Sequence, residues 1–227
     1  MKMTEPFTPI QHIIGTTQFC GLDFAVDEHC LIPRPETEIL VEESMKFILR
    51  AAGSVQHMWV LDLCTGSGCI AISLFVKLTL SANSCKIIAS DISAAALERA
   101  QRNVARHHAG KGVSFVQCDL FDGIIGRFDC IISNPPYIAR HEFASLQKEV
   151  LREPRIALDG GEDGLDLYRR IAADAPAHLT NGGRLFLEIG WGQADAVRDI
   201  LETSGLGVRA VHKDNAGIDR IVVAQLL

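Results

Sequence analysis

Short apolar runs alternate with amphipathic stretches along most of this chain, and several of the runs end at a polar or glycine residue. The apolar runs have the length of buried strands, and the stretches between them show helical spacing of apolar residues. The predicted strands span 58–63, 86–89, 113–117, 128–133, 184–189, 208–212 and 220–224. The predicted helices begin at Glu36 or Thr37 and at residues 68, 94, 164 and 193; the last four end at residues 80, 108, 178 and 203.

This alternation predicts an α/β fold: a doubly wound, mostly parallel, seven-stranded Rossmann-like sheet. Ahead of it, residues 16–27 are predicted to form an N-terminal β-hairpin around Gly21. Its candidate inward side chains are Phe19, Leu22, Phe24 and Val26. Two prolines exclude a helix at 31–35, so we expect a hairpin and linker at 1–35 and the main domain at 36–227.

The composition argues against a nucleic-acid-binding, metal-binding or membrane protein. The chain has 227 residues and a net charge of -6, so it lacks the overall basic charge that non-specific duplex binding requires. Seven cysteines without a C-x-x-C pair, and histidines without a ligand-like array, predict a reduced protein with no metal. The N-terminus lacks a signal-peptide pattern, and the apolar stretch 70–80 is too short to span a bilayer. We therefore expect a cytoplasmic protein with no membrane and no stable nucleic-acid partner.

A glycine loop, 62–68, separates the first predicted strand of the main domain from its helix. Its candidate ligand-binding residues are Cys64, Thr65, Gly66, Ser67 and Gly68. Glycines allow close backbone approach, and the following helix offers free N–H groups to dinucleotide phosphates or to the amino-acid part of S-adenosylmethionine. Cys64 stands where a dinucleotide fingerprint has its first glycine, which argues against NAD. A plain strand-to-helix turn is the competing interpretation.

Two acidic residues follow the next strands. Asp91 has the spacing from the loop of a ribose-binding acid; the alternative is a helix N-cap, for which Ser93 competes. Asp119 ends the following strand, where either an adenine contact or a solvated loop acid fits equally well.

The segment Asn134-Pro135-Pro136-Tyr137 after the strand 128–133 is the most specific feature of the chain. Its prolines make it rigid and leave backbone carbonyls free for a ligand. The Asn134 side-chain oxygen and the Pro135 carbonyl are suited to accept the two N–H groups of a planar amide or amino group, with Tyr137 packing on its face. Orienting the acceptor nitrogen toward a methyl donor is then the main catalytic contribution.

These features together resemble the HemK-type family of release-factor glutamine N5-methyltransferases, within the class I S-adenosylmethionine-dependent enzymes. The matching segments are 31–38, 62–68, Asp91, 134–137, 153–154, 157–164, 188–190 and 219–220. The resemblance implies methyl transfer to a glutamine in the Gly-Gly-Gln loop of peptide chain release factors, in translation termination. Cofactor positions carry over to the 64–68 loop, Asp91, Leu120 and Asn134, and substrate positions to 134–137.

Enzymes that methylate other acceptors share parts of this sequence pattern. Adenine-N6 methyltransferases of nucleic acids have the Asn-Pro-Pro-Tyr tetrapeptide, and a sister enzyme modifies a glutamine of a ribosomal protein. A non-catalytic binding module with the same fold is a further alternative. The segment 33–38 favours the release-factor enzymes, although members of that family usually carry an N-terminal helical domain that helps to dock the release factor, and this chain starts almost at the hairpin.

Three further residues have competing interpretations. Arg34 is a candidate for binding a substrate or cofactor carboxylate, but a structural ion pair with Glu36 or Glu38 is favoured slightly. Glu153 is expected to form a surface salt bridge, with a place beside the substrate pocket as the alternative. Trp191 is expected to cap the end of the sheet.

Overall fold

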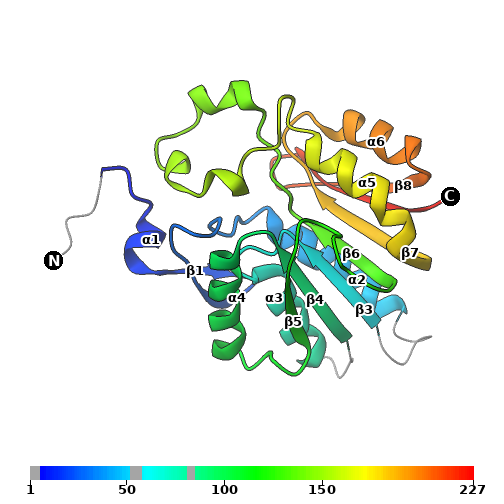
Figure 1. Ribbon diagram of the computed structural model, residues 1–227, viewed down its shortest axis with the longest axis horizontal. Coiled ribbons are helices and arrows are strands. Elements are labelled where there is room, and N and C mark those ends of the chain that lie inside the picture. The colour runs from blue at the N-terminus through cyan, green and yellow to red at the C-terminus, as the bar shows by residue number, and fades with distance from the viewer. Residues whose placement is uncertain (1–5, 52–57, 81–84) are drawn as a thin grey trace.

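A computed structural model describes residues 6–51, 58–80 and 85–227 and contains a seven-stranded sheet of order β5-β4-β3-β6-β7-β9-β8 (Figure 1). Its strands are β3 (Met58–Leu63), β4 (Cys85–Asp91), β5 (Val113–Gln117), β6 (Phe128–Ser133), β7 (Leu179–Glu188), β8 (Leu206–Lys213) and β9 (Asp219–Leu226). The strands from β3 to β7 pair in parallel, whereas β9 pairs antiparallel to both β7 and β8. The predicted mostly parallel, seven-stranded sheet is confirmed.

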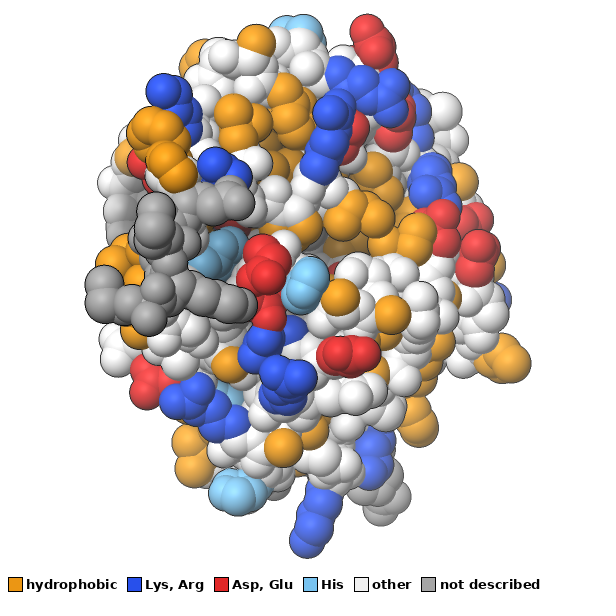
Figure 2. Space-filling view, turned by 60° about the vertical axis from the view of Figure 1, so that its left-hand side comes forward, with side chains coloured by type: hydrophobic (Ala, Val, Ile, Leu, Met, Phe, Trp, Pro, Cys, Tyr) orange, Lys and Arg blue, Asp and Glu red, His pale blue; other side chains and the backbone are white. Residues whose placement is uncertain are grey.

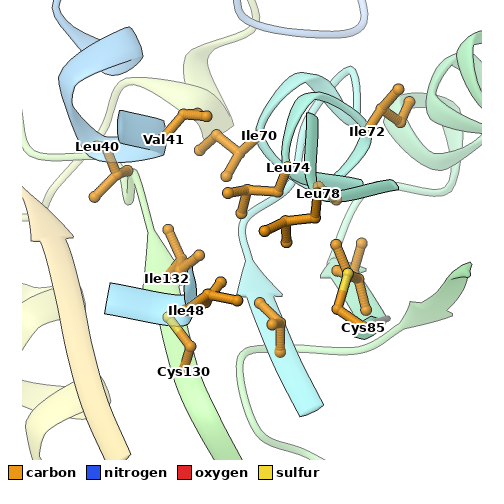
Figure 3. Close-up of a cluster of buried hydrophobic side chains, with 14 of the residues drawn as sticks. Leu40, Val41, Ile48, Ile70, Ile72, Leu74, Leu78, Cys85, Cys130 and Ile132 are labelled. Carbon is orange, nitrogen blue, oxygen red and sulfur yellow. The ribbon is translucent and has the colours of Figure 1, made fainter. Parts of the chain in front are cut away.

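The core lies on both faces of this sheet because successive residues of a strand point to opposite sides. Val60 and Cys130 belong to the cluster on one face, and their neighbours Leu61 and Ile131 belong to the cluster on the other. Figure 3 shows the first cluster, in which Leu74 of helix α3 faces strands β3 and β6. This burial on both faces explains why the strands read as continuous apolar runs instead of alternating ones.

Helices cover the two faces. They are α2 (Thr37–Ala51), α3 (Cys69–Leu80), α4 (Ala94–Arg106), α5 (Asp166–His178) and α6 (Ala194–Thr203). Helices α2 and α3 contribute to one core cluster, and α5 and α6 to the other. Helix α4 ends before the predicted residue 108, because His108 takes a left-handed φ of 54° and cannot continue the helix.

The predicted N-terminal hairpin is also confirmed, with β1 (Thr16–Phe19) paired antiparallel to β2 (Leu22–Ala25). The side chains of Phe19, Phe24 and Val26 are buried, and that of Leu22 is only partly buried. The buried side chain of Asn103 connects the hairpin to helix α4. Its amide donates to Ala25 O (3.0 Å) and accepts from Ala25 N (2.8 Å).

Four short elements were not predicted: the helix α1 (Ile10–Ile14) and the 3-10 helices η1 (Arg140–Ser145), η2 (Val150–Arg152) and η3 (Arg155–Ala157). The 3-10 helices belong to a long segment between β6 and α5, which arches above the sheet in Figure 1. No helix in the described ranges combines the length and the apolar character needed to cross a membrane.

Candidate functional site

A pocket of about 260 Å³ lies at the carboxyl ends of the parallel strands. Ligands bind at this edge in open α/β sheets, because the loops after neighbouring strands converge there. The pocket is lined by residues of the linker, the end of β4, the loops after β3 to β6, the first turns of α2, α3 and α4, the η3 segment and α5. They are His29, Cys30, Leu31, Pro33, Arg34, Thr37, Cys64, Thr65, Gly66, Ser67, Cys69, Ile70, Ser90, Asp91, Ile92, Ser93, Ala96, Cys118, Asp119, Leu120, Asn134, Pro136, Ile156, Ala157, Asp159, Leu167 and Arg170.

Asp62, which is fully buried in β3, stabilises the glycine loop through hydrogen bonds. Its Oδ2 accepts from the Thr65 hydroxyl (2.6 Å) and from Ala71 N (3.3 Å), which fixes the loop against the start of α3. Burial raises the pKa of Asp62 to about 7, although these two hydrogen bonds oppose the shift. Asp62 does not line the pocket itself, so its role is to fix the conformation of the loop. The loop residues that line the pocket are Cys64, Thr65, Gly66 and Ser67.

Two residues of the loop show why it needs small side chains. Gly68 has φ +80°, and a Cβ there would lie 3.1 Å from the Ala100 Cβ of α4, so glycine allows the loop to pack closely on that helix. Cys64 also has a left-handed φ, of 58°, a conformation that favours glycine or a small side chain. Gly68 itself does not line the pocket, so its contribution is to the shape of the loop.

Asp91 ends β4 and lies beside the loop in the pocket. Its Oδ2 accepts from Gly66 N (2.8 Å) and its Oδ1 from Ser93 N (2.9 Å). Each carboxylate oxygen keeps a lone pair for a further donor, such as a ribose hydroxyl. The N-cap of α4 is Ser93, whose hydroxyl accepts from Ala96 N (3.2 Å), so capping does not occupy Asp91. Burial raises the pKa of Asp91, and its backbone hydrogen bonds oppose that shift.

The next loop contributes Asp119 and Leu120. Asp119 lines the pocket but also forms an ion pair with Arg170 of α5 (2.9 Å), so both interpretations of this residue have support. Leu120 is 5% exposed and lines the pocket with an apolar side chain. Two serines, Ser67 and Ser90, also line it, and their buried hydroxyl oxygens have no hydrogen-bond partner in the described part of the chain. An apolar wall with polar atoms still to be paired suits a nucleoside with an amino-acid tail.

Two residues of the Asn-Pro-Pro-Tyr segment, Asn134 and Pro136, line this pocket. Pro135 is buried, and Tyr137 is partly buried in the core cluster on the α5 side, next to Gly190. The Tyr137 carbonyl accepts from the Gln193 amide (3.0 Å), and Ile138 N donates to Leu158 O (3.0 Å). Pro135 and Tyr137 are not among the residues that line this pocket, and the packing of the Tyr137 ring on an acceptor stays a prediction.

Asn134 lies beside two polar residues whose role the sequence did not indicate. Its Nδ2 donates to the Thr37 hydroxyl oxygen at the start of α2 (3.2 Å). Glu188, at the end of β7, is 2% exposed and receives hydrogen bonds from the Thr37 and Asn134 side chains. Burial raises the pKa of Glu188 to about 7, and these hydrogen bonds and nearby Arg220 oppose the shift.

The expectations for Arg34 and Glu153 were wrong in part. Arg34 lines the pocket, but its ion-pair partner is Glu153 instead of Glu36 or Glu38. Glu153 is only 5% exposed, so it does not form a surface salt bridge, and its Oε2 also accepts from Ile32 N (2.8 Å). The pair connects the linker, which lines the pocket, to the end of the η2 segment. Glu38 instead accepts from Cys20 N (2.7 Å) in the hairpin turn.

The cysteines of the pocket and Trp191 show no features of reactive residues. Burial raises the pKa of the pocket thiols Cys30, Cys64, Cys69 and Cys118, which favours unreactive, protonated side chains. Within the described ranges, no group of His, Cys, Asp and Glu is arranged to hold a metal ion. Trp191 is 80% exposed, so it does not cap the sheet as a buried residue would.

Two solved methyltransferase structures illustrate the similarity of the fold. A methyltransferase from Pyrococcus furiosus superposes with a TM-score of 0.63 at 18% identity, covering 90% of this chain and 88% of that one. Magnesium protoporphyrin IX methyltransferase from Synechocystis PCC 6803, with bound SAM, has a TM-score of 0.54 at 18% identity, covering 83% and 79%. At this identity the likeness establishes the fold.

Sequence comparison gives a narrower result. Residues 40–164 match the family described as "Methyltransferase small domain". A protein from Geobacter sulfurreducens named release factor glutamine methyltransferase is 44% identical over 216 residues, which cover 94% of this chain and 72% of the relative. Its namesake from Thermodesulfovibrio yellowstonii is 44% identical over 222 residues, covering 96% and 76%. With this identity over nearly its whole length, the chain belongs to the release factor glutamine methyltransferase family.

Proposed function

We propose that this protein transfers a methyl group from S-adenosylmethionine to the side-chain amide nitrogen of the glutamine in the Gly-Gly-Gln loop of peptide chain release factors. The observation that carries the proposal is the position of Asn134. It lines the same pocket as Asp91 and the glycine loop, and its Nδ2 is bound to Thr37. Its Oδ1 is therefore the atom left to accept a hydrogen bond from a substrate amide.

The pocket residues have a division of roles in this proposal. Cys64, Thr65, Gly66 and Ser67 hold the amino-acid part of the cofactor, Asp91 accepts the ribose hydroxyls, and Leu120 contacts the adenine. When bound, S-adenosylmethionine supplies an electrophilic methyl group on a sulfonium. This distribution follows the usual order of ligand groups along the carboxyl edge of such a sheet.

The substrate amide requires positioning more than activation by a base. Asn134 Oδ1 accepts one of its N–H groups, and Pro136 bounds the acceptor in the pocket. The second N–H group is assigned to the backbone carbonyl of Pro135, which lies between these two pocket residues in the chain although Pro135 itself does not line the pocket. The amide nitrogen forms its bond to the methyl carbon as the carbon–sulfur bond breaks, and one N–H proton leaves to solvent. Alignment of two held reactants contributes up to about 7–11 kcal/mol in favourable intramolecular systems. The two acceptors also stabilise the positive charge that develops on nitrogen.

A protein acceptor agrees with the charge of the chain. The net charge of -6 gives no overall attraction for phosphate backbones. On the face shown in Figure 2, acidic and hydrophobic side chains separate the groups of Lys and Arg side chains. Exposed apolar residues Leu151 and Ile156 belong to the segment that borders the pocket, and they offer a contact for a protein loop.

The test is transfer of labelled methyl from S-adenosylmethionine to a purified release factor. Label is expected on the wild-type factor and not on a factor whose Gly-Gly-Gln glutamine is replaced by alanine. Asn134→Ala in this protein is expected to abolish transfer while the fold is retained. Label on both factors would contradict the assigned acceptor, and labelling of RNA or of a ribosomal protein alone would identify a different substrate. Full activity of Asn134→Ala would contradict its role.

A further inference from the structure

The side-chain amide of Asn134 has two chemically different ends, and only one of them is suited to accept a substrate N–H. If the amide turned by 180°, its NH₂ group would face the pocket and its oxygen would face α2 and β7. An asparagine at this position therefore acts on an amide substrate only in one of its two orientations. Something beside Asn134 must make that orientation the more stable one.

The sheet places Glu188 next to Asn134. Strands β6 and β7 pair in parallel with Ser133 opposite Leu187, so the residues that follow them lie side by side. Glu188 is buried at 2% exposure, and its Oε2 has no hydrogen-bond partner in the described part of the chain. This carboxylate is not part of the pocket wall, so it does not meet the substrate directly.

Thr37 completes the arrangement from the other side. Its oxygen accepts from Asn134 Nδ2 (3.2 Å), which leaves its own hydroxyl proton to be donated, and Glu188 is the acceptor beside it. An ionised carboxylate has only acceptor atoms. The hydrogen bonds therefore run in one direction: the Asn134 amide donates to the Thr37 hydroxyl, and the Thr37 hydroxyl donates to the Glu188 carboxylate. A reversed Asn134 amide would place its oxygen against a buried negative charge.

We propose that Thr37 and Glu188 are positioning residues that hold the Asn134 amide with its nitrogen toward the protein and its oxygen toward the substrate nitrogen. This inference rests on the proposed glutamine methylation and assigns an indirect role to two residues that do not take part in the chemistry. It accounts for a nearly inaccessible carboxylate at this place, because an apolar side chain would accept either orientation of the amide.

The charge on Glu188 matters for this role. The charged and titratable groups that face it are Arg220, Glu36, Tyr137 and Tyr168. A protonated Glu188 is itself a donor and is able to stabilise the reversed Asn134 amide, so the ionised form is the one that supports transfer. Activity should therefore rise with pH as Glu188 ionises, in a step that belongs to this residue.

The experiment measures kcat, KM for the release factor, and the S-adenosylmethionine Kd in the full chain. Thr37→Val removes the hydroxyl at nearly constant shape, and Thr37→Ser restores it. Thr180→Val is the matched control, because Thr180 also donates to a carboxylate, Asp129 (2.9 Å), in the opposite part of β7. Thr37→Val is expected to lower kcat by roughly tenfold to a hundredfold, as loss of reactant alignment does. Thr37→Ser should recover most of it, with cofactor Kd unchanged throughout.

Glu188→Gln supplies a second readout that a merely structural residue would not change. Its amide offers a donor and an acceptor at every pH, so the kcat–pH profile should lose the step seen in the wild type. Unchanged kcat in Thr37→Val, or the same pH step in Glu188→Gln, would overturn the inference, as would a loss confined to thermal stability or to cofactor Kd. Inactive wild-type protein would instead reject the proposed function, so the two failures are distinguishable.

Discussion

Gly66 donates its backbone N–H to Asp91 Oδ2 at 2.8 Å, which joins the glycine loop after β3 to the end of β4. The two residues are 25 positions apart in the sequence. The hydrogen bond makes them one unit, so the acid that is proposed to bind the ribose also helps to hold the loop that is proposed to bind the amino-acid part of the cofactor.

Asp91→Asn is expected to weaken S-adenosylmethionine binding because it removes the charge from the proposed ribose acceptor and replaces one carboxylate oxygen with an NH₂ group. Hydrogen bonds to charged groups contribute about 1.5–3 kcal/mol, so the Kd should rise by roughly tenfold or more. Isothermal titration calorimetry measures this change. Asp129→Asn is the matched control: Asp129 also accepts from a backbone N–H, that of Trp59 (2.9 Å), near the start of β3 and away from the pocket. Equal effects of the two variants would contradict the ribose role.

Cys64 adopts the left-handed φ of 58°, which favours glycine over a branched side chain. Cys64→Val should lower the free energy of unfolding by about 2 kcal/mol, because a β-branched residue is strained in this region. Cys64→Gly should stay within about 1 kcal/mol of the wild type, since relief of strain offsets the greater chain entropy of glycine. Urea unfolding of the three proteins tests the order, and a Val variant as stable as the Gly variant would refute it.

The Arg34–Glu153 ion pair is expected to stabilise the linker against the η2 segment. Arg34→Met leaves a carboxylate that is only 5% exposed without its cation, and should cost about 2 kcal/mol of unfolding free energy. In a double-mutant cycle, Arg34→Met combined with Glu153→Gln should cost less than the sum of the single changes, because the neutral amide does not require a cation. Strict additivity would show that the pair does not interact in solution.

Asp62 gives a prediction for the pH dependence of stability. Burial raises its pKa from an ordinary 3.8 to about 7 in the folded protein. Between these values the folded state holds a proton that the unfolded chain releases, so this residue lowers the free energy of unfolding as pH rises through the window, with no further change above it. The stability of Asp62→Asn relative to the wild type should therefore increase from pH 4 to about pH 7. A constant difference, measured by urea unfolding at each pH, would argue against the shift.

The sequence by itself determined the features that depend on neighbouring residues. The strands β3, β5 and β6 were predicted with their observed bounds. In β3 and β6, burial on both faces gives a nearly continuous apolar run. The edge strand β5 is short and only its first residue is buried, so its prediction depended on its Val and Phe residues. The glycine loop, Asp91 and Asn134 were found as candidates because each follows a strand, and the carboxyl ends of parallel strands meet at one edge.

Only the tertiary structure decided which distant residues meet. Glu153 reaches Arg34 across 119 positions of the chain, and Asn103 reaches Ala25 across 78. Glu188 lies beside Asn134 because β7 pairs with β6, a neighbour relation that the apolar pattern of neither strand encodes. The short helices α1 and η1 to η3 also escaped prediction, since they have few turns in which a helical period can be recognised. Local periodicity specifies elements, whereas their long-range pairing follows from how the whole chain buries its apolar surface.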